Sequence, residues 1–162
     1  MTGPTLTAQD RQDIKMVLAR YVQVIDNADW ERADAVFTAD ATFGGGSDTP
    51  GTPLGEMIDG FDEMVAARPV PLFPHQCTDA VLIAVAPGVV RSWSKFFTVR
   101  ADGTVTSGDY MDTIVRTGAG SWRVKNRAAS MGNRPDTDPF GPSRRTFTST
   151  IWRTHPNEPG PA

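Results

Sequence analysis

Asp26 and His75 are the two residues of this 162-residue chain whose types and surroundings best suit the movement of a proton. Asp26 follows Leu18 and Val22 in steps of four, so it continues one side of an amphipathic helix toward the core or a cavity in it. A carboxylate at such a place can act as a general acid or base. The alternative is that Asp26 lies just past the helix end and caps a turn or the next helix.

His75 is one of only two histidines, and it opens a segment with a period of two, which is typical of a strand. On this pattern His75 shares a strand face with Cys77, Val81 and Ile83. An imidazole at the mouth of an apolar sheet face can shuttle protons, although a hydrogen-bonded structural histidine at a strand edge is the alternative. We expect His75 and Asp26 to lie within hydrogen-bond reach of each other.

Asp112 is an acid in the middle of a predicted strand, where it shares one face with Tyr110. Acids are uncommon at such positions, so Asp112 is either a site residue or one half of an ion pair. In the second case its partner would be Arg116, or Arg123 or Arg127 on the following strand. The residues alone leave both interpretations open.

Tyr21 lies within the apolar side of the first helix, and a buried phenol needs a hydrogen-bond partner. A carboxylate in a cavity would be a natural partner, although a plain core aromatic is the alternative. Four further side chains are expected to bind the substrate, namely Trp93, Phe97, Tyr110 and Met111.

Hydrophobic periodicity predicts the elements that would position these side chains. Helices are predicted over residues 7–26, 30–38 and 54–67, with a short strand over residues 40–43. Thr7 is the expected N-cap of the first helix, and Asp29 that of the second. Glycines and prolines between these segments mark loops.

From His75 onward the pattern changes to that of strands. They are predicted over residues 75–85, 89–100, 104–117 and 121–131. Short turns separate them, so an antiparallel meander is expected. With helices first and strands second, the fold class is α+β, with a curved sheet around the helices. We expect one domain over residues 1–133. Residues 134–162 would form an extension, a lid or a dimer arm, with a disordered end.

Composition excludes several classes of function. The net charge is −3, with 16 basic and 19 acidic residues interspersed, so no nucleic-acid partner is expected. No apolar run approaches the roughly 20 residues of a membrane helix, and the first residues lack a signal-peptide pattern. The single Cys77 excludes a disulfide framework and a cysteine-based zinc site, and it suits a cytoplasmic location. No motif indicates a metal or another cofactor.

Three stretches carry a resemblance to a known family: RYVQVIDNADWERADAVFTADATF, PHQCTD and GDYMDTIVRTGAGSWRVKNR. They are similar to the nuclear-transport-factor-2-like superfamily in its SnoaL-like branch, over roughly residues 7–131. The resemblance implies a cone-shaped fold in which a curved, mostly antiparallel sheet encloses a long helix and a deep pocket. It is specific for the fold but not for the reaction, because this superfamily hosts dehydratases, isomerases, cyclases, hydrolases and non-catalytic binding modules.

The resemblance also implies roles for individual residues. Tyr21 and Asp112 fall on the oxyanion-hole tyrosine and the protonated aspartic acid of ketosteroid isomerases, whose base would fall near Gly45. Asp26 and His75 fall on the acid–base pair of scytalone dehydratases. SnoaL-type polyketide cyclases are similar in having a pocket aspartate at the place of Asp112.

Together these features predict a cofactor-free lyase or isomerase, a dehydratase or cyclase, for a hydrophobic polyketide-like or polycyclic carbonyl compound. His75 would be the base, oriented by Asp26, and Tyr21 and a protonated Asp112 would donate to the carbonyl oxygen. The alternatives are a non-enzymatic module that binds a small ligand, or the small subunit of a ring-hydroxylating dioxygenase. A homodimer or higher homo-oligomer is expected.

Overall fold

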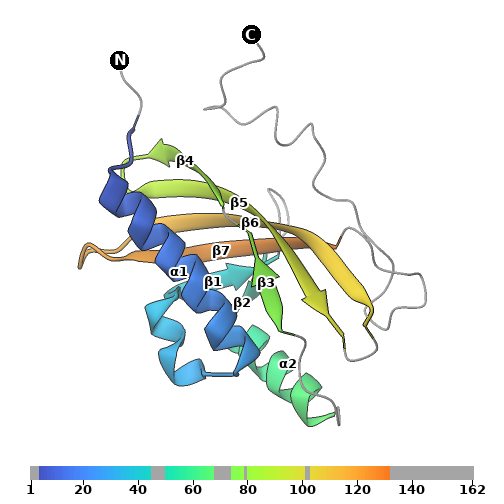
Figure 1. The fold of residues 1–162 in the computed structure, drawn as a ribbon. Helices are drawn as coiled ribbons and strands as arrows, with labels where there is room; N and C mark the ends of the chain where they lie inside the picture. The colour runs from blue at the N-terminus through green and yellow to red at the C-terminus, as the bar shows by residue number, and fades with distance from the viewer. Residues whose placement is uncertain (1–3, 45–49, 68–73, 79, 101–102, 132–162) are drawn as a thin grey trace.

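The computed structural model describes residues 4–44, 50–67, 74–78, 80–100 and 103–131 of the chain (Figure 1). Its helices are α1 (Ala8–Asp26), the 3-10 helix η1 (Trp30–Ala35) and α2 (Leu54–Ala66). Its strands are β1 (Phe37–Phe43), β2 (Thr52–Pro53), β3 (His75–Cys77), β4 (Val81–Ala86), β5 (Val89–Val99), β6 (Val105–Arg116) and β7 (Trp122–Met131). This arrangement confirms the α+β fold class.

Helix α1 begins where the sequence predicts. The Thr7 hydroxyl accepts a hydrogen bond from the Asp10 backbone N–H at 3.0 Å, and the Asp10 carboxylate accepts one from the Thr7 backbone N–H at 3.1 Å, which completes a capping box. The Asp10 carboxylate also accepts a hydrogen bond from the indole N–H of Trp122, at 3.1 Å. Asp10 therefore connects the start of α1 to the start of β7.

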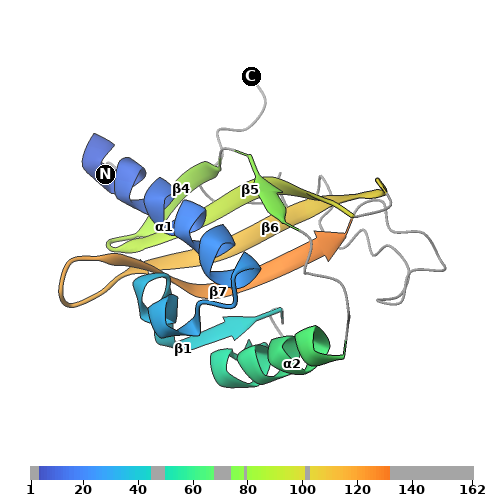
Figure 2. The ribbon, with the colours of Figure 1, turned by 60° about the horizontal axis from the view of Figure 1, so that its bottom comes forward.

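The strands form one curved sheet, and α1 lies across its concave face (Figures 1 and 2). The order is β2-β1-β7-β6-β5-β3, and β4 also pairs with β5. Strands β5, β6 and β7 form the predicted antiparallel meander. Gly103 lies between β5 and β6 and Gly120 between β6 and β7, with φ of 82° and 85°. Strand β1 adds to β7 in parallel, so the sheet is mixed.

The segment predicted as a second helix over residues 30–38 is shorter and different in kind. It forms the 3-10 helix η1, and the chain turns into β1 at Phe37, three residues before the predicted start of that strand. Within this described segment, the Asp29 side chain makes no capping hydrogen bond and instead pairs with Arg32 at 3.3 Å. Val36 and Phe37 are buried against the sheet and α1, which favours the extended backbone here.

The strand predicted over residues 75–85 is broken into two. Cys77 pairs with Phe96, and Val81 pairs with Trp93. The chain from β3 to β4 therefore uses one more residue between these pairs than β5 does. One extra residue reverses the faces of all the following side chains. The prediction that His75 and Cys77 share a face with Val81 is therefore wrong. His75 faces the concave side and Val81 the convex side.

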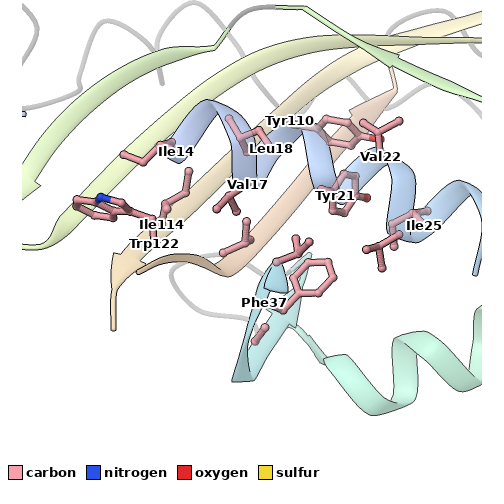
Figure 3. Close-up of a cluster of buried hydrophobic side chains, with 14 of the residues drawn as sticks. Ile14, Val17, Leu18, Tyr21, Val22, Ile25, Phe37, Tyr110, Ile114 and Trp122 are labelled. Carbon is pink, nitrogen blue, oxygen red and sulfur yellow. The ribbon is translucent and has the colours of Figure 1, made fainter. Parts of the chain in front are cut away.

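The core lies between α1 and the concave face of the sheet (Figure 3). Its members from α1 and the sheet include Ile14, Val17, Leu18, Tyr21, Val22, Ile25, Phe37, Tyr110, Ile114, Trp122 and Val124. The other helix, α2, contributes no fully buried residue. It is attached by the indole N–H of Trp30, which donates to Asp62 at 2.8 Å, and by an edge-to-face contact of Trp30 with Phe61.

The predicted extension over residues 134–162, and its boundary at residue 133, lie outside the described residues.

Candidate active site

The last residue of α1 and the first residue of β3 place a carboxylate beside an imidazole. Oδ2 of Asp26 accepts a hydrogen bond from the His75 backbone N–H at 2.7 Å, and Oδ1 lies 2.5 Å from Nδ1 of His75. The predicted contact between these two residues is confirmed. The alternative, in which Asp26 caps a turn or the next helix, is wrong, because its carboxylate contacts His75.

This geometry determines which ring nitrogen is basic. An ionised carboxylate only accepts hydrogen bonds, so the neutral imidazole carries its proton on Nδ1 and leaves Nε2 as the base. The side chains of His75 and Asp26 are 19% and 17% exposed, so the pair is not sealed in the core. Such a pair can accept a proton at Nε2 while the carboxylate stabilises the imidazolium that forms.

A second polar group crosses three neighbouring strands on the concave face. Asp112 lies directly opposite Ser92 on β5 and Arg127 on β7. Its carboxylate accepts hydrogen bonds from Nε of Arg127 at 2.6 Å, from Nη2 at 2.9 Å and from the Ser92 hydroxyl at 2.8 Å. All three side chains are buried. Of the interpretations left open by the sequence, the structure shows the ion pair, with Arg127 as partner.

This pairing corrects the role expected of Asp112. Both of its carboxylate oxygens accept hydrogen bonds from Arg127 and Ser92, so the Asp112 side chain is directed at these two residues and not at a substrate carbonyl. Burial alone would lower the pKa of the Arg127 guanidinium, but the adjacent Asp112 carboxylate outweighs burial and raises this pKa above its ordinary value. Arg127 is therefore a permanent buried cation.

Two phenol rings enclose this cation. The guanidinium carbon of Arg127 lies 3.7 Å from the centre of the Tyr21 ring and 4.3 Å from that of Tyr110. The two rings meet edge to face at 5.8 Å (Figure 3). Burial raises the pKa of both phenols above its ordinary value, so both stay protonated. Tyr21 thus lies in the core and also beside the polar group.

A stack of rings connects the cation to the acid–base pair. Tyr110 stacks on Phe96 with ring centres 4.2 Å apart and planes at 19°, and Phe96 lies 6.3 Å from the His75 ring. Gly108 makes this stack possible, because a Cβ there would lie 2.8 Å from the Phe96 ring and 2.0 Å from the Ser130 carbonyl oxygen. The side chains that lie between the two polar groups are therefore aromatic.

Three of the four residues predicted to bind substrate lie elsewhere. Side chains alternate along a strand, and Tyr110 and Phe96 face the concave side. Trp93, Phe97 and Met111, at odd spacing from them, face the convex side. They cannot line a pocket with His75, and only Tyr110 belongs to the candidate site.

Arg127 and Phe96 are the site residues that sequence analysis did not single out. Among the described residues, no group of three histidine, cysteine or acidic side chains is placed to bind a metal ion. Nor is any described helix both long and apolar enough to span a membrane.

Comparison with known proteins identifies a family. A family model described as the SnoaL-like domain matches residues 6–128, well over half of the chain. No curated protein sequence matches. Among solved structures, a scytalone dehydratase-like protein from Novosphingobium aromaticivorans is 15% identical with a TM-score of 0.63, over 85% of this chain and 93% of the other.

Two more solved structures are similar. A hexachlorocyclohexane dehydrochlorinase of the LinA type from Novosphingobium barchaimii is 16% identical with a TM-score of 0.64, over 77% of this chain and 88% of its own. A protein assigned as the β subunit of an aromatic-ring-hydroxylating dioxygenase from N. aromaticivorans is 19% identical with a TM-score of 0.60, over 83% and 96%. At these identities the likenesses show the shared fold.

Proposed function

The chain belongs to the SnoaL-like domain family, and we propose that it is a cofactor-free lyase or isomerase that removes a proton from a carbon activated by a carbonyl group. The observation that carries the proposal is the contact of 2.5 Å between Oδ1 of Asp26 and Nδ1 of His75. It gives the imidazole a fixed tautomer and orientation, which a general base needs.

The surroundings of the pair support a hydrophobic substrate. Phe96 and Tyr110 present ring surface between His75 and the buried Arg127, and Leu54, Met57 and Phe61 of the neighbouring segment are only partly buried. A flat, unsaturated or polycyclic carbonyl compound would match such walls. The fold shared with the dehydratase-like protein and the dehydrochlorinase is compatible with elimination, in which a leaving group departs after the proton.

The reaction divides into two tasks. Nε2 of His75 accepts the proton from carbon, and Asp26 stabilises the resulting imidazolium through Nδ1–H. A hydrogen-bond donor must then stabilise the negative charge that moves onto the carbonyl oxygen. Dehydration, cyclisation and double-bond migration all share this first step.

Deuterium exchange tests the proposal without knowledge of the natural substrate. Aromatic and polycyclic ketones are incubated with the protein in D2O. Deuterium incorporation at carbons next to the carbonyl or conjugated with it is followed by NMR. We expect exchange with at least one of them, and a loss of about 10²–10⁴ in rate in His75→Ala. Gln76→Ala, an exposed neighbour on β3, is the matched control and should keep the wild-type rate.

Two outcomes would contradict the proposal. If exchange in His75→Ala equals that of the wild type, His75 is not the base. If ketones bind but none exchanges, the protein is a binding module rather than an enzyme of this type.

A further inference from the structure

One charged atom in the buried group of the concave face has no hydrogen-bond partner among the residues that the structure describes. Arg127 is 3% exposed, and its Nε and Nη2 both donate to Asp112. Its third nitrogen, Nη1, is buried and has no hydrogen-bond partner among the described residues. Buried donors are normally satisfied, and one on a cation is costly to leave unpaired. An unpaired donor of this kind indicates a ligand that completes it.

We propose that Nη1 of Arg127 binds the carbonyl oxygen of the substrate and stabilises the enolate oxygen when the proton leaves. This inference rests on the proposed function for the proton transfer, but the oxygen-binding part stands on Arg127 alone. It replaces Asp112, whose oxygens are occupied, as the donor to that oxygen.

The charge of the site fits an oxygen that becomes negative during the reaction. Asp112 already neutralises the guanidinium, so a neutral carbonyl group can bind to Nη1 without an ionic partner of its own. As negative charge develops on the oxygen, the hydrogen bond from the cation strengthens. Fixed donors of this kind stabilise the transition state more than the ground state.

The orientation of the donor is fixed before substrate binds. The fork of Nε and Nη2 on Asp112 sets the plane of the guanidinium, and the rings of Tyr21 and Tyr110 lie against it. Ala129 lies two positions after Arg127 on β7 and therefore on the same face of the sheet. It pairs with Tyr110 and is exposed. The concave face is thus open to solvent directly beside the buried cation.

The spacing of the two polar centres indicates the size of the substrate. Tyr21, which contacts Arg127, and Asp26, which holds His75, are five residues apart on α1, or roughly 7–8 Å along the helix axis. A fused-ring compound can place a carbonyl oxygen at Arg127 and a conjugated carbon at His75.

The electrons and the proton balance in this step. The proton passes from carbon to Nε2 of His75. The C–H electron pair forms a new carbon–carbon double bond, the conjugated double bond between that carbon and the carbonyl shifts toward the carbonyl carbon, and the carbonyl π pair moves to oxygen. Nη1–H of Arg127 donates to that oxygen. No oxidant or reductant takes part.

The test uses 2-naphthol as a probe, because its hydroxyl oxygen on a fused-ring frame resembles the enolate oxygen. Its affinity is compared with that of naphthalene, which has the same rings and no oxygen. The double variant Asp112→Asn, Arg127→Met removes the cation without leaving an unpaired buried charge. Arg127→Lys is a second variant, since its single nitrogen is used by Asp112. Arg116→Met, which removes an arginine near Asp10 and over Trp122, is the matched control.

We expect the wild-type protein to bind 2-naphthol more tightly than naphthalene. Both Arg127 variants should lose about 10- to 100-fold in affinity for 2-naphthol, the usual value of a hydrogen bond to a charged group, and keep their affinity for naphthalene. Arg116→Met should bind both compounds as the wild type does, and His75→Ala should keep the preference for 2-naphthol over naphthalene.

Three results would overturn the inference: no preference for 2-naphthol in the wild type, an equal loss for both compounds in the Arg127 variants, or a preference that disappears in His75→Ala. The last would place the oxygen at His75 instead. Because the probe is not turned over, failure of the proton-exchange test leaves the naphthol result intact, and the two proposals can fail separately.

Discussion

The Asp26 carboxylate holds His75 twice, through the backbone N–H at 2.7 Å and through Nδ1 at 2.5 Å, although 49 positions of sequence separate the two residues. The first bond fixes where β3 begins relative to the end of α1, and the second fixes the ring. One carboxylate therefore contributes to the fold and to the candidate chemistry together, and its substitution should affect both.

Asp26→Asn should lower the free energy of unfolding by about 1–3 kcal/mol, because the amide keeps one acceptor but loses the charge-assisted bond. Urea denaturation at neutral pH measures this change. Asp13→Asn, on the same helix with an exposed contact to Gln9, is the control and should change stability by less than about 0.5 kcal/mol. Equal effects of the two substitutions would mean that the Asp26–His75 contact adds nothing to the stability of the fold.

The buried pair of Asp112 and Arg127 should behave as a unit. Arg127→Met alone should cost about 3–5 kcal/mol of unfolding free energy, since it leaves an unpaired carboxylate in the core. Adding Asp112→Leu should recover most of this loss. A double-mutant cycle from denaturation curves measures the coupling, and additive losses would contradict a direct buried ion pair.

Gly108 and Gly60 should respond in opposite directions to the same substitution. Gly108→Ala should cost about 1–3 kcal/mol or more, because the new Cβ would overlap the Ser130 carbonyl oxygen and the Phe96 ring. Gly60→Ala, inside α2 with open space around it, should stabilise by up to about 1 kcal/mol. Thermal melts of both variants check this pair of signs. If Gly108→Ala melts with the wild type, Phe96 does not lie over Gly108.

Asp10 should make folding sensitive to acid. Hydrogen bonds from the Thr7 hydroxyl, the Trp122 indole and the Thr7 backbone lower the pKa of its carboxyl below the ordinary 3.8. A lowered folded-state pKa stabilises the fold above the unfolded pKa, and this stabilisation is lost as pH falls through the folded value. Denaturation of the wild type and Asp10→Asn should therefore differ at neutral pH and converge below about pH 4. If the stability difference between the wild type and Asp10→Asn persists unchanged in acid, the lowered pKa of Asp10 is not its cause.

Local signals were sufficient for the elements with strong periodicity. The apolar spacing and the Thr7 cap predict α1 to within one residue, and the glycine turns at Gly103 and Gly120 predict the meander of β5, β6 and β7. The contact of Asp26 with His75 follows from these elements together with the family resemblance. The expected oligomer and location stay predictions.

Irregularities of register explain what the sequence could not predict. From the turn at Gly120, a regular hairpin would place Asn126 opposite Asp112. The structure shifts register between Thr113 and Ile114, and Arg127 takes that place and turns to the concave face. A single inserted residue carries no clear pattern in the sequence. Arg127 was therefore only one of three possible partners, and its role beside the tyrosines was not predicted.

The choice of Trp93, Phe97 and Met111 as pocket residues rested on the type of side chain alone, and it was wrong. Trp93 and Met111 lie directly opposite each other on β5 and β6, which made them plausible neighbours, but on the convex face. Which face of a sheet holds the site depends on where α1 packs, and that is a tertiary contact.

The measurement that tests the central claim most directly is the rate of deuterium exchange into a ketone by Asp26→Asn, His75→Ala and the double variant. If Asp26 acts only through His75, the double variant exchanges at the rate of His75→Ala alone, about 10²–10⁴ below the wild type. A double variant whose loss equals the product of the two single losses would show that the residues act independently, and the acid–base pair would be rejected.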